Sequence, residues 1–148
     1  MTYTPPIKVI TIPGVPVPKL RPRVTKTGRA YTPARTRNWE KMASQVIALT
    51  WGSTPKIKRP INLVIAAVFP RPKRRPKMVS KEAWDSGLRI WRPAKPDLDN
   101  VVKAVCDAAQ MSGVLADDSY VVELAARKLY SGAFDDGPQV LLSFVEVQ

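Results

Sequence analysis

Apolar side chains alternate or run together at four places along the chain, and each place predicts a β-strand. Residues 7–12 (IKVITI) are rich in β-branched side chains and predict a first strand. Residues 61–69 (INLVIAAVF) form a nearly continuous apolar run, which is typical of a buried central strand. Residues 119–130 and 138–147 combine β-branched and apolar side chains, and the turn SGAFDDGP joins them. We therefore expect these last two strands to pair as a C-terminal β-hairpin.

A helical period of apolar residues predicts two main helices. The first covers about residues 34–51 and begins beside Pro33, a residue favoured in the first helical turn. The second covers residues 98–111, and its buried face is formed by Leu98, Val101, Val102, Val105 and Ala109. This order of elements, with a short helix added within residues 80–91, predicts an α/β fold of the α+β type. We expect a single compact domain over residues 1–148, with a mixed sheet, two main helices packed on it and basic loop arms.

Charge is distributed unevenly along the chain. Residues 1–96 hold 21 Lys and Arg against 3 Asp and Glu, whereas residues 97–148 hold 3 against 9. Fourteen of the 15 prolines precede Asp97, so the basic part is rich in loops. Clustered cations of this kind favour binding to the phosphates of a nucleic acid. The residues that we expect to contact phosphate are Lys19, Arg21, Arg23, Arg71, Lys73, Arg74 and Arg75.

The basic segments are accompanied by aromatic residues. Tyr31, Trp84 and Trp91 are candidates for stacking on unpaired bases. Packing in the core or at an interface explains the tryptophans equally well. Each cation, taken singly, also fits a solvated surface charge.

The residue types exclude several kinds of catalytic site. The chain has no histidine and one cysteine, Cys106, which removes Ser-His-Asp triads, Cys-His dyads and the usual zinc sites. Catalysis would then rest on carboxylates, lysines, hydroxyls and a hard cation that prefers oxygen ligands. Cys106 fits a small packing residue in a reducing cytosol. The first 14 residues show no signal-peptide pattern and no apolar run is long enough to span a membrane, so we expect a cytoplasmic protein without a membrane partner.

The stretch KPDLDNVVKAVCDA, residues 95–108, places carboxylates at the start of the second helix. Asp99, Lys103 and Asp107 are each four residues apart and share the face opposite the buried one. Asp97 precedes the helix. Taken alone, this is ordinary helix chemistry, with Asp99 as the N-cap and Lys103 as its i, i+4 partner.

A second acidic pair favours a functional role for the first. Asp117 and Asp118 lie at the turn between the helix, which Gly113 can end, and the next strand. They also fit turn residues that bond their own backbone. A strand that docks beside the helix would bring Asp118 back to Asp97 and Asp99. Three converging carboxylates repel one another unless a cation such as Mg²⁺ or Mn²⁺ neutralises them.

A site of this composition fits phosphodiester hydrolysis. The cation would activate water and stabilise charge on the scissile phosphate. Lys103 would contact the phosphate or the developing charge. The basic arms would hold the rest of the nucleic acid backbone.

The same residues resemble a known family. KPDLDNVVKAVCDA and GVLADDSYVVEL, with PVPKLRPRVTKTGRAYTPARTR and FPRPKRR upstream, resemble the RusA family of Holliday junction resolvases, particularly its phage and prophage members. The resemblance implies a homodimer that makes paired nicks in four-way DNA junctions with Mg²⁺ or Mn²⁺. The metal-binding catalytic carboxylates that it implies are Asp97, Asp99 and Asp118, with Lys103 as the catalytic lysine. Asp117 and Asp107 match acidic positions of the motif as secondary candidates for ligation.

One segment differs from the shortest members of that family. Residues 78–94 are longer here and less clearly patterned, and a DNA-contacting loop is one role for them. The resemblance also implies that this protein acts on branched DNA in the cytoplasm of a bacterial host and is encoded by a phage or prophage.

Two other functions fit parts of the sequence. A non-catalytic nucleic-acid-binding protein, such as an RNA-binding or ribosome-associated factor, explains the charge but leaves the clustered acids without a role. A D-x-D enzyme that uses nucleotides fits less well, because Val101 stands where the D-x-D-x-T motif of one phosphatase class has threonine. The carboxylate block therefore favours a Mg²⁺-dependent, structure-selective DNA endonuclease.

Overall fold

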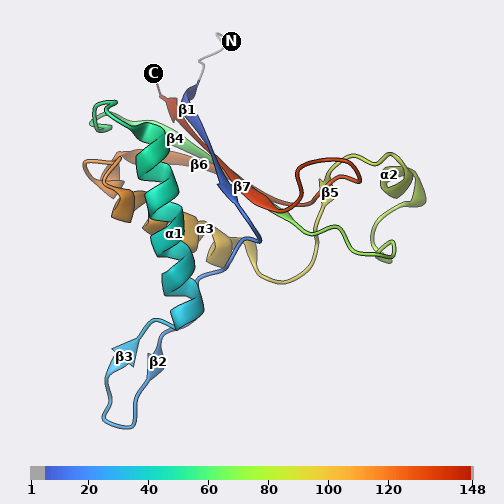
Figure 1. The fold of residues 1–148 in the computed structure, drawn as a ribbon, viewed down its shortest axis with the longest axis horizontal. Helices are drawn as coiled ribbons and strands as arrows, with labels where there is room; N and C mark the ends of the chain where they lie inside the picture. Colours follow the sequence, from blue (N-terminus) through green and yellow to red (C-terminus); the bar gives the residue numbers. More distant parts are fainter. Residues whose placement is uncertain (1–5, 148) are drawn as a thin grey trace.

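A five-stranded mixed sheet forms the centre of the fold (Figure 1). The computed structural model describes residues 6–147. The strands lie in the order β1 (Pro6–Pro13), β7 (Gln139–Glu146), β4 (Ile61–Phe69), β6 (Val121–Tyr130) and β5 (Ile90–Trp91). The central strand, β4, pairs in parallel with β6 and antiparallel with β7. The predicted mixed sheet is confirmed, and the central position of β4 explains its continuous apolar run.

The predicted C-terminal hairpin is wrong, because β6 and β7 are not neighbours. β4 lies between them, and Ile65 of β4 pairs with Ala126 on one side and Leu142 on the other. The connecting segment crosses the end of β4, where the Ser131 amide donates to the Phe69 carbonyl at 2.8 Å. The observed order pairs both edges of the apolar β4. Turn residues predict that the chain reverses, but they do not determine which strand it meets afterwards.

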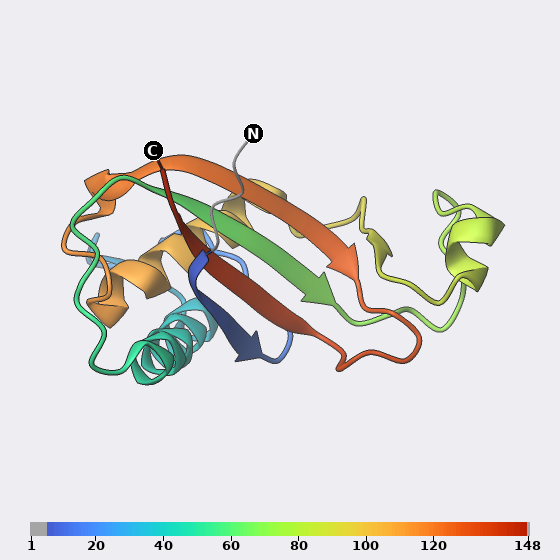
Figure 2. The same cartoon turned by 90° about the horizontal axis from the view of Figure 1, so that it is seen from above.

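Two helices, α1 (Ala34–Trp51) and α3 (Leu98–Ser112), cover one face of the sheet (Figure 2). These bounds confirm both predicted helices. Their apolar sides pack with alternate residues of β1, β4 and β7 into one core. Trp51 of α1 meets Phe144 of β7 edge to face, with ring centroids 5.4 Å apart. α3 ends at Gly113, whose φ of 78° is a left-handed conformation that glycine adopts without steric cost.

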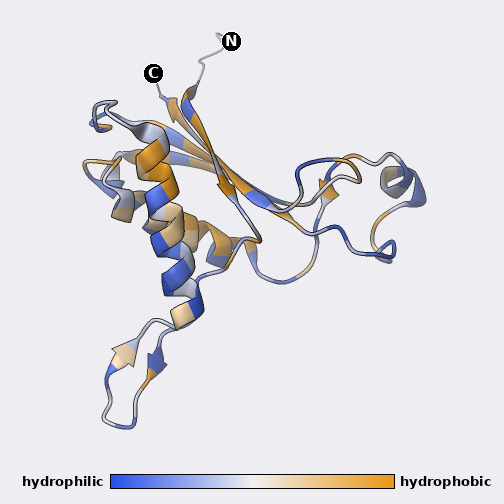
Figure 3. Cartoon of the chain, viewed as in Figure 1, coloured by the Kyte–Doolittle hydropathy of each residue, from blue (hydrophilic) through white to orange (hydrophobic). Residues whose placement is uncertain are grey.

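Two projections extend from this core (Figure 1). The basic hairpin, residues 19–33, contains the paired strands β2 (Arg23–Val24) and β3 (Ala30–Tyr31). The distal lobe, residues 70–93 with residues 131–137, contains α2 (Lys81–Asp85) and β5. The expected short helix is therefore confirmed only over α2. Figure 3 shows hydrophobic residues concentrated in the sheet and in the helical segments beside it, whereas the basic hairpin is largely hydrophilic.

The described helices are not membrane spans. No helix within residues 6–147 is both long enough and apolar enough to cross a bilayer. The expectation that the chain begins without a leader concerns in part residues 1–5, which lie outside the described residues.

Candidate functional site

Asp97 occupies the N-cap position of α3, with an extended backbone (φ −65°, ψ 141°). Its carboxylate makes no hydrogen bond to the helix backbone and instead accepts one from the Lys95 ammonium at 2.6 Å. That hydrogen bond and the charge of Lys95 hold the pKa of Asp97 below its usual value, and the charge of Lys128 adds to the effect. The side chain is 54% exposed. The cap position therefore carries an ionised, accessible carboxylate, which ligation of a cation requires.

Asp99 and Lys103 lie on the exposed face of α3. Asp99 is in the first helical turn, so the cap position predicted for it belongs to Asp97. The Lys103 ammonium lies 3.8 Å from the Asp99 carboxylate, and the two side chains are 62% and 69% exposed. An exposed i, i+4 pair of this kind is worth only a few tenths of a kcal/mol, about 0.3–0.5. Both groups are therefore available to a ligand at little energetic cost.

Lys128 of β6 fastens the loop that leads to Asp97. Its ammonium donates hydrogen bonds to the carbonyl oxygens of Ala94 at 2.6 Å and Pro96 at 2.7 Å. Burial, followed by the charge of Arg92, lowers the pKa of Lys128, although the nearby Asp97 opposes this change. The sequence patterns did not predict this role. A lysine near the end of a largely apolar strand is the feature that would have indicated it.

Arg92 ties the same loop to the end of the sheet. Its guanidinium lies over the rings of Phe69 and Tyr130, 4.4 Å and 5.2 Å from their centroids. It also donates a hydrogen bond to the Lys95 carbonyl. The two rings come from β4 and β6, so no local pattern in the sequence relates them to Arg92. Together Arg92 and Lys128 fix the backbone that orients Asp97.

Asp117 and Asp118 lie beyond the other end of α3, where the 3₁₀ helix η1 (Asp118–Tyr120) leads into β6. Asp117 accepts a hydrogen bond from the Ser119 amide at 3.0 Å, as expected of a turn residue, and this bond lowers its pKa. α3 has 15 residues and spans about 22 Å, and β6 runs back beside it. The expected convergence of Asp97, Asp99 and Asp118 is therefore not formed within one chain. Residues 6–147 contain no group of three carboxylate or thiol side chains positioned to hold an ion.

Asp107 and Lys19 belong to an ion cluster that anchors the basic hairpin. The Lys19 ammonium lies 2.8 Å from Glu40 of α1 and 2.9 Å from Asp107 of α3. The Lys19 amide also donates to the Asn100 carbonyl at 2.8 Å. Burial disfavours the charged ammonium, but the hydrogen bonds to Glu40 and Asp107 outweigh it and raise the pKa of Lys19. Both carboxylates already pair with the Lys19 ammonium within the protein, which favours an anchoring role for Lys19 and Asp107 over contact with phosphate or metal.

The other cations expected to contact phosphate divide into exposed and engaged side chains. The exposed ones are Arg21, Arg23, Lys73, Arg74 and Arg75, although Arg75 and the half-buried Arg71 also make hydrogen bonds within the protein. Arg71 lies 3.9 Å over the Trp84 ring and donates to the Trp84 carbonyl at 2.6 Å. Arg75 donates to the Val79 carbonyl at 2.9 Å. Trp84 is thus a packing residue under Arg71, whereas Tyr31 and Trp91 are 44% and 65% exposed.

An apolar hollow of about 630 Å³ lies between α3 and β6, beside Asp99 and Lys103. Its apolar walls include Val102 of α3 and Leu124 of β6. Leu124 is 50% exposed. Within the described chain, β5 pairs only with the last two residues of β6, which leaves most of that strand's outer edge open. An unpaired strand edge and exposed apolar side chains therefore border the candidate site.

The chain is similar to known proteins over most of its length. A family model described as "Endodeoxyribonuclease RusA" matches residues 13–135, a span that includes the carboxylate block of α3 and Asp118. The chain is also similar to the uncharacterized protein YqaN of Bacillus subtilis (strain 168). The two are 33% identical over 126 residues, covering 82% of this chain and 86% of the relative. The chain therefore belongs to the RusA endodeoxyribonuclease family.

Proposed function

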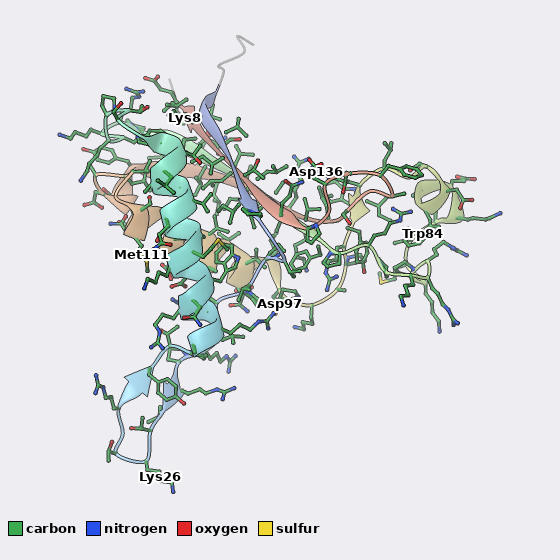
Figure 4. The ribbon with its side chains drawn as sticks, in the orientation of Figure 1. Lys8, Lys26, Trp84, Asp97, Met111 and Asp136 are labelled. Carbon is green, nitrogen blue, oxygen red and sulfur yellow. The ribbon has the colours of Figure 1, made fainter. Side chains whose placement is uncertain are left out.

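We propose that the protein is a Mg²⁺-dependent endonuclease that resolves four-way DNA junctions by paired, symmetric nicks. Family membership supports the endodeoxyribonuclease activity. The position of Asp97 supports the branched substrate. This carboxylate lies at the corner from which the basic hairpin and the distal lobe diverge, and Lys26 and Trp84 mark those two projections in Figure 4. Basic projections that diverge from one acidic position suit a DNA whose arms also diverge.

The donors at the start of α3 fit Mg²⁺ or Mn²⁺. Asp97 and Asp99 offer exposed carboxylate oxygens, which hard cations prefer as ligands. The hydrogen bond from the Lys95 ammonium, at 2.6 Å, lowers the pKa of Asp97 and so favours its ionised form. A bound ion would supply an activated water and stabilise charge on the scissile phosphate. Lys103, one turn along α3, would offset charge on a phosphate held beside Asp99.

We infer that the enzyme is a homodimer and that the second protomer completes the set of acids. Asp118 lies at the far end of α3 from Asp97 in the same chain. If two α3 helices pack antiparallel about a two-fold axis, Asp97 and Asp99 approach the partner subunit's Asp118. The hollow between α3 and β6, with Leu124 half exposed, supports an interface on this face. A four-way junction is nearly two-fold symmetric, so two equal sites would cut opposed strands.

The test is cleavage of a synthetic four-way junction, labelled on each strand in turn, with Mg²⁺ or with EDTA. We expect metal-dependent nicks at symmetric positions on opposed strands. Asp97→Asn keeps the shape of the side chain but removes its charge, so nicking should be lost while junction binding persists. Glu146→Gln, on β7, is the matched control and should cut like the parent.

Two results would contradict the proposal. An Asp97→Asn protein that nicks as fast as the parent would show that the catalytic site has been assigned to the wrong residues. Tight junction binding without metal-dependent nicking would instead identify a non-catalytic nucleic-acid-binding protein.

A further inference from the structure

We propose that the distal lobe contacts unpaired bases at the branch of the DNA, and that a base stacks on the ring of Phe134. The choice of substrate rests on the proposed function. The residues involved lie outside the site at α3. They belong to the β6–β7 connection and to the segment around α2.

The loop that carries Phe134 is fixed by the residue that follows it. The Asp135 carboxylate accepts hydrogen bonds from the amides of Gly132 at 2.6 Å and Gly137 at 2.8 Å. It also accepts one from the Arg89 guanidinium at 3.0 Å. One carboxylate thus closes the loop at both ends and joins it to the segment after α2. The loop tip is held in one orientation, as a stacking platform requires.

A close backbone contact joins the loop to that segment at a second point. The Ala133 amide donates to the Gly87 carbonyl at 2.9 Å. The same carbonyl lies so near Gly132 that a Cβ atom built on this glycine would be 2.8 Å from it. Only glycine allows two backbones to approach this closely. The two halves of the distal lobe therefore form one unit.

Large apolar side chains are exposed on this unit. Phe134 is 97% exposed and lines a shallow hollow of about 410 Å³ with Leu88, which is 69% exposed. Met78 and Trp91, 78% and 65% exposed, line a second hollow of about 300 Å³. Exposed apolar groups that gather on one unit mark a contact surface.

The charge around these side chains favours nucleic acid as the partner. Residues 70–93 contain eight Lys and Arg against two Asp and Glu. The Arg127 guanidinium lies 5.7 Å from the centroid of the Trp91 ring. Cations beside exposed aromatic rings bind single-stranded nucleic acid, because the cations attract phosphates while the rings stack on bases. A second copy of the chain would meet this surface with the same excess of positive charge, +12 overall.

The position of the lobe relates it to the branch rather than to a distant duplex arm. Its first part ends at residue 93, four residues before Asp97. Figure 4 shows the lobe, marked by Trp84, extending to one side of Asp97. A DNA strand with a phosphate at Asp97 would thus pass beside the lobe. Bases at the branch are the ones that can leave their stack and meet the exposed ring.

The test compares binding of a four-way junction with binding of a linear duplex of the same arm sequence, by fluorescence anisotropy in EDTA. Phe134→Ala and Phe134→Leu should weaken junction binding by about 5- to 150-fold, the loss expected for one stacked base. Phe134→Trp should retain it, and duplex binding should not change. Leu49→Ala is the matched control, since Leu49 is 82% exposed on α1. Thermal unfolding of all variants should match that of the parent, because the ring has no packing to lose.

Several results would overturn the inference. The inference fails if Phe134→Ala binds the junction as tightly as the parent does. It also fails if Leu49→Ala loses as much junction affinity as Phe134→Ala, or if the parent binds the junction no more tightly than the duplex. A change in the sedimentation of the DNA-free protein on Phe134→Ala would assign the ring to a protein interface instead. Nicking by the parent is scored separately. A parent that binds the junction but does not nick it contradicts the proposed function, while the Phe134 comparison still decides the role of the lobe.

Discussion

The Lys128 ammonium lies 2.7 Å from the carbonyl oxygen of Pro96, the residue immediately before Asp97. A second hydrogen bond, to the Ala94 carbonyl at 2.6 Å, makes Lys128 a clamp on this loop. The clamp joins the sheet to the start of α3 at the point where the candidate site begins. Because Lys128 acts on the backbone that carries Asp97, we assign it as a positioning residue.

Lys128→Met keeps much of the aliphatic stem but removes both hydrogen bonds. We expect the single-turnover nicking rate to fall about 10- to 100-fold and the Mg²⁺ concentration for half-maximal nicking to rise, as for other residues that orient a metal ligand. Junction affinity in EDTA should change little. Lys41→Met, an exposed lysine of α1, is the control. Parental metal dependence in Lys128→Met would show that the clamp does not orient Asp97.

Subunit mixing tests the composite arrangement proposed for the acids. Asp97→Asn and Asp118→Asn proteins should each be inactive. A mixed dimer would hold one site with both substitutions and one with neither. After exchange, the mixture should recover about a quarter of the parental sites, since half of the dimers are mixed and each has one intact site. The product should be a single nick in each junction, and a mixture that stays inactive would contradict a site shared between protomers.

The anchor of the basic hairpin has a defined dependence on pH. The pKa of Lys19 is raised in the folded protein. The stabilisation that its ion pairs contribute is therefore fully present below the ordinary lysine value of 10.5 and is lost as pH rises through the raised pKa. Lys19→Met should lower the free energy of unfolding by about 1 kcal/mol at neutral pH. Urea unfolding at pH 7, 9 and 11 should show that the difference in the free energy of unfolding between the parent and Lys19→Met narrows only at the highest pH. Lys26→Met, at the far end of the hairpin, should have the same free energy of unfolding as the parent at every pH.

The loop of the distal lobe has the opposite pH dependence. Burial disfavours the ionised Asp135, but hydrogen bonds from Gly132, Gly137 and Arg89 outweigh it and lower its pKa. The contribution of Asp135 to loop stability is therefore present above the ordinary value of 3.8 and lost as pH falls through the depressed pKa.

Asp135→Asn should speed amide hydrogen exchange in residues 131–137 by about tenfold at neutral pH, because charged acceptor bonds are lost. The difference from the parent should shrink below the ordinary value of 3.8. Asp136→Asn, at the neighbouring position, is the control. Unchanged protection in Asp135→Asn at neutral pH would show that this carboxylate does not close the loop.

Local patterns were sufficient for the elements that a short stretch of chain specifies. The i, i+3, i+4 spacing of apolar residues predicted α1 and α3, because one helical face must be buried wherever the helix lies. The continuous apolar run of β4 predicted a strand enclosed by neighbours. The helical period placed Asp99 and Lys103 on one exposed face with Asp97 just before the helix. The second acidic pair and the family resemblance then singled out these residues as a candidate site before any fold was known.

Contacts between distant segments were decided only in the folded chain. The reversal after β6 is compatible with a hairpin or with a crossing over β4, and the folded chain adopts the second, in which both edges of the apolar strand are paired. The separation of Asp118 from Asp97 follows from β6 starting where α3 ends. The links from Lys19 to Glu40 and from Lys128 to Pro96 span 21 and 32 residues, and no local period relates such partners. Packing of the sheet against two helices brought them together, since that arrangement buries the apolar faces of the sheet and of both helices.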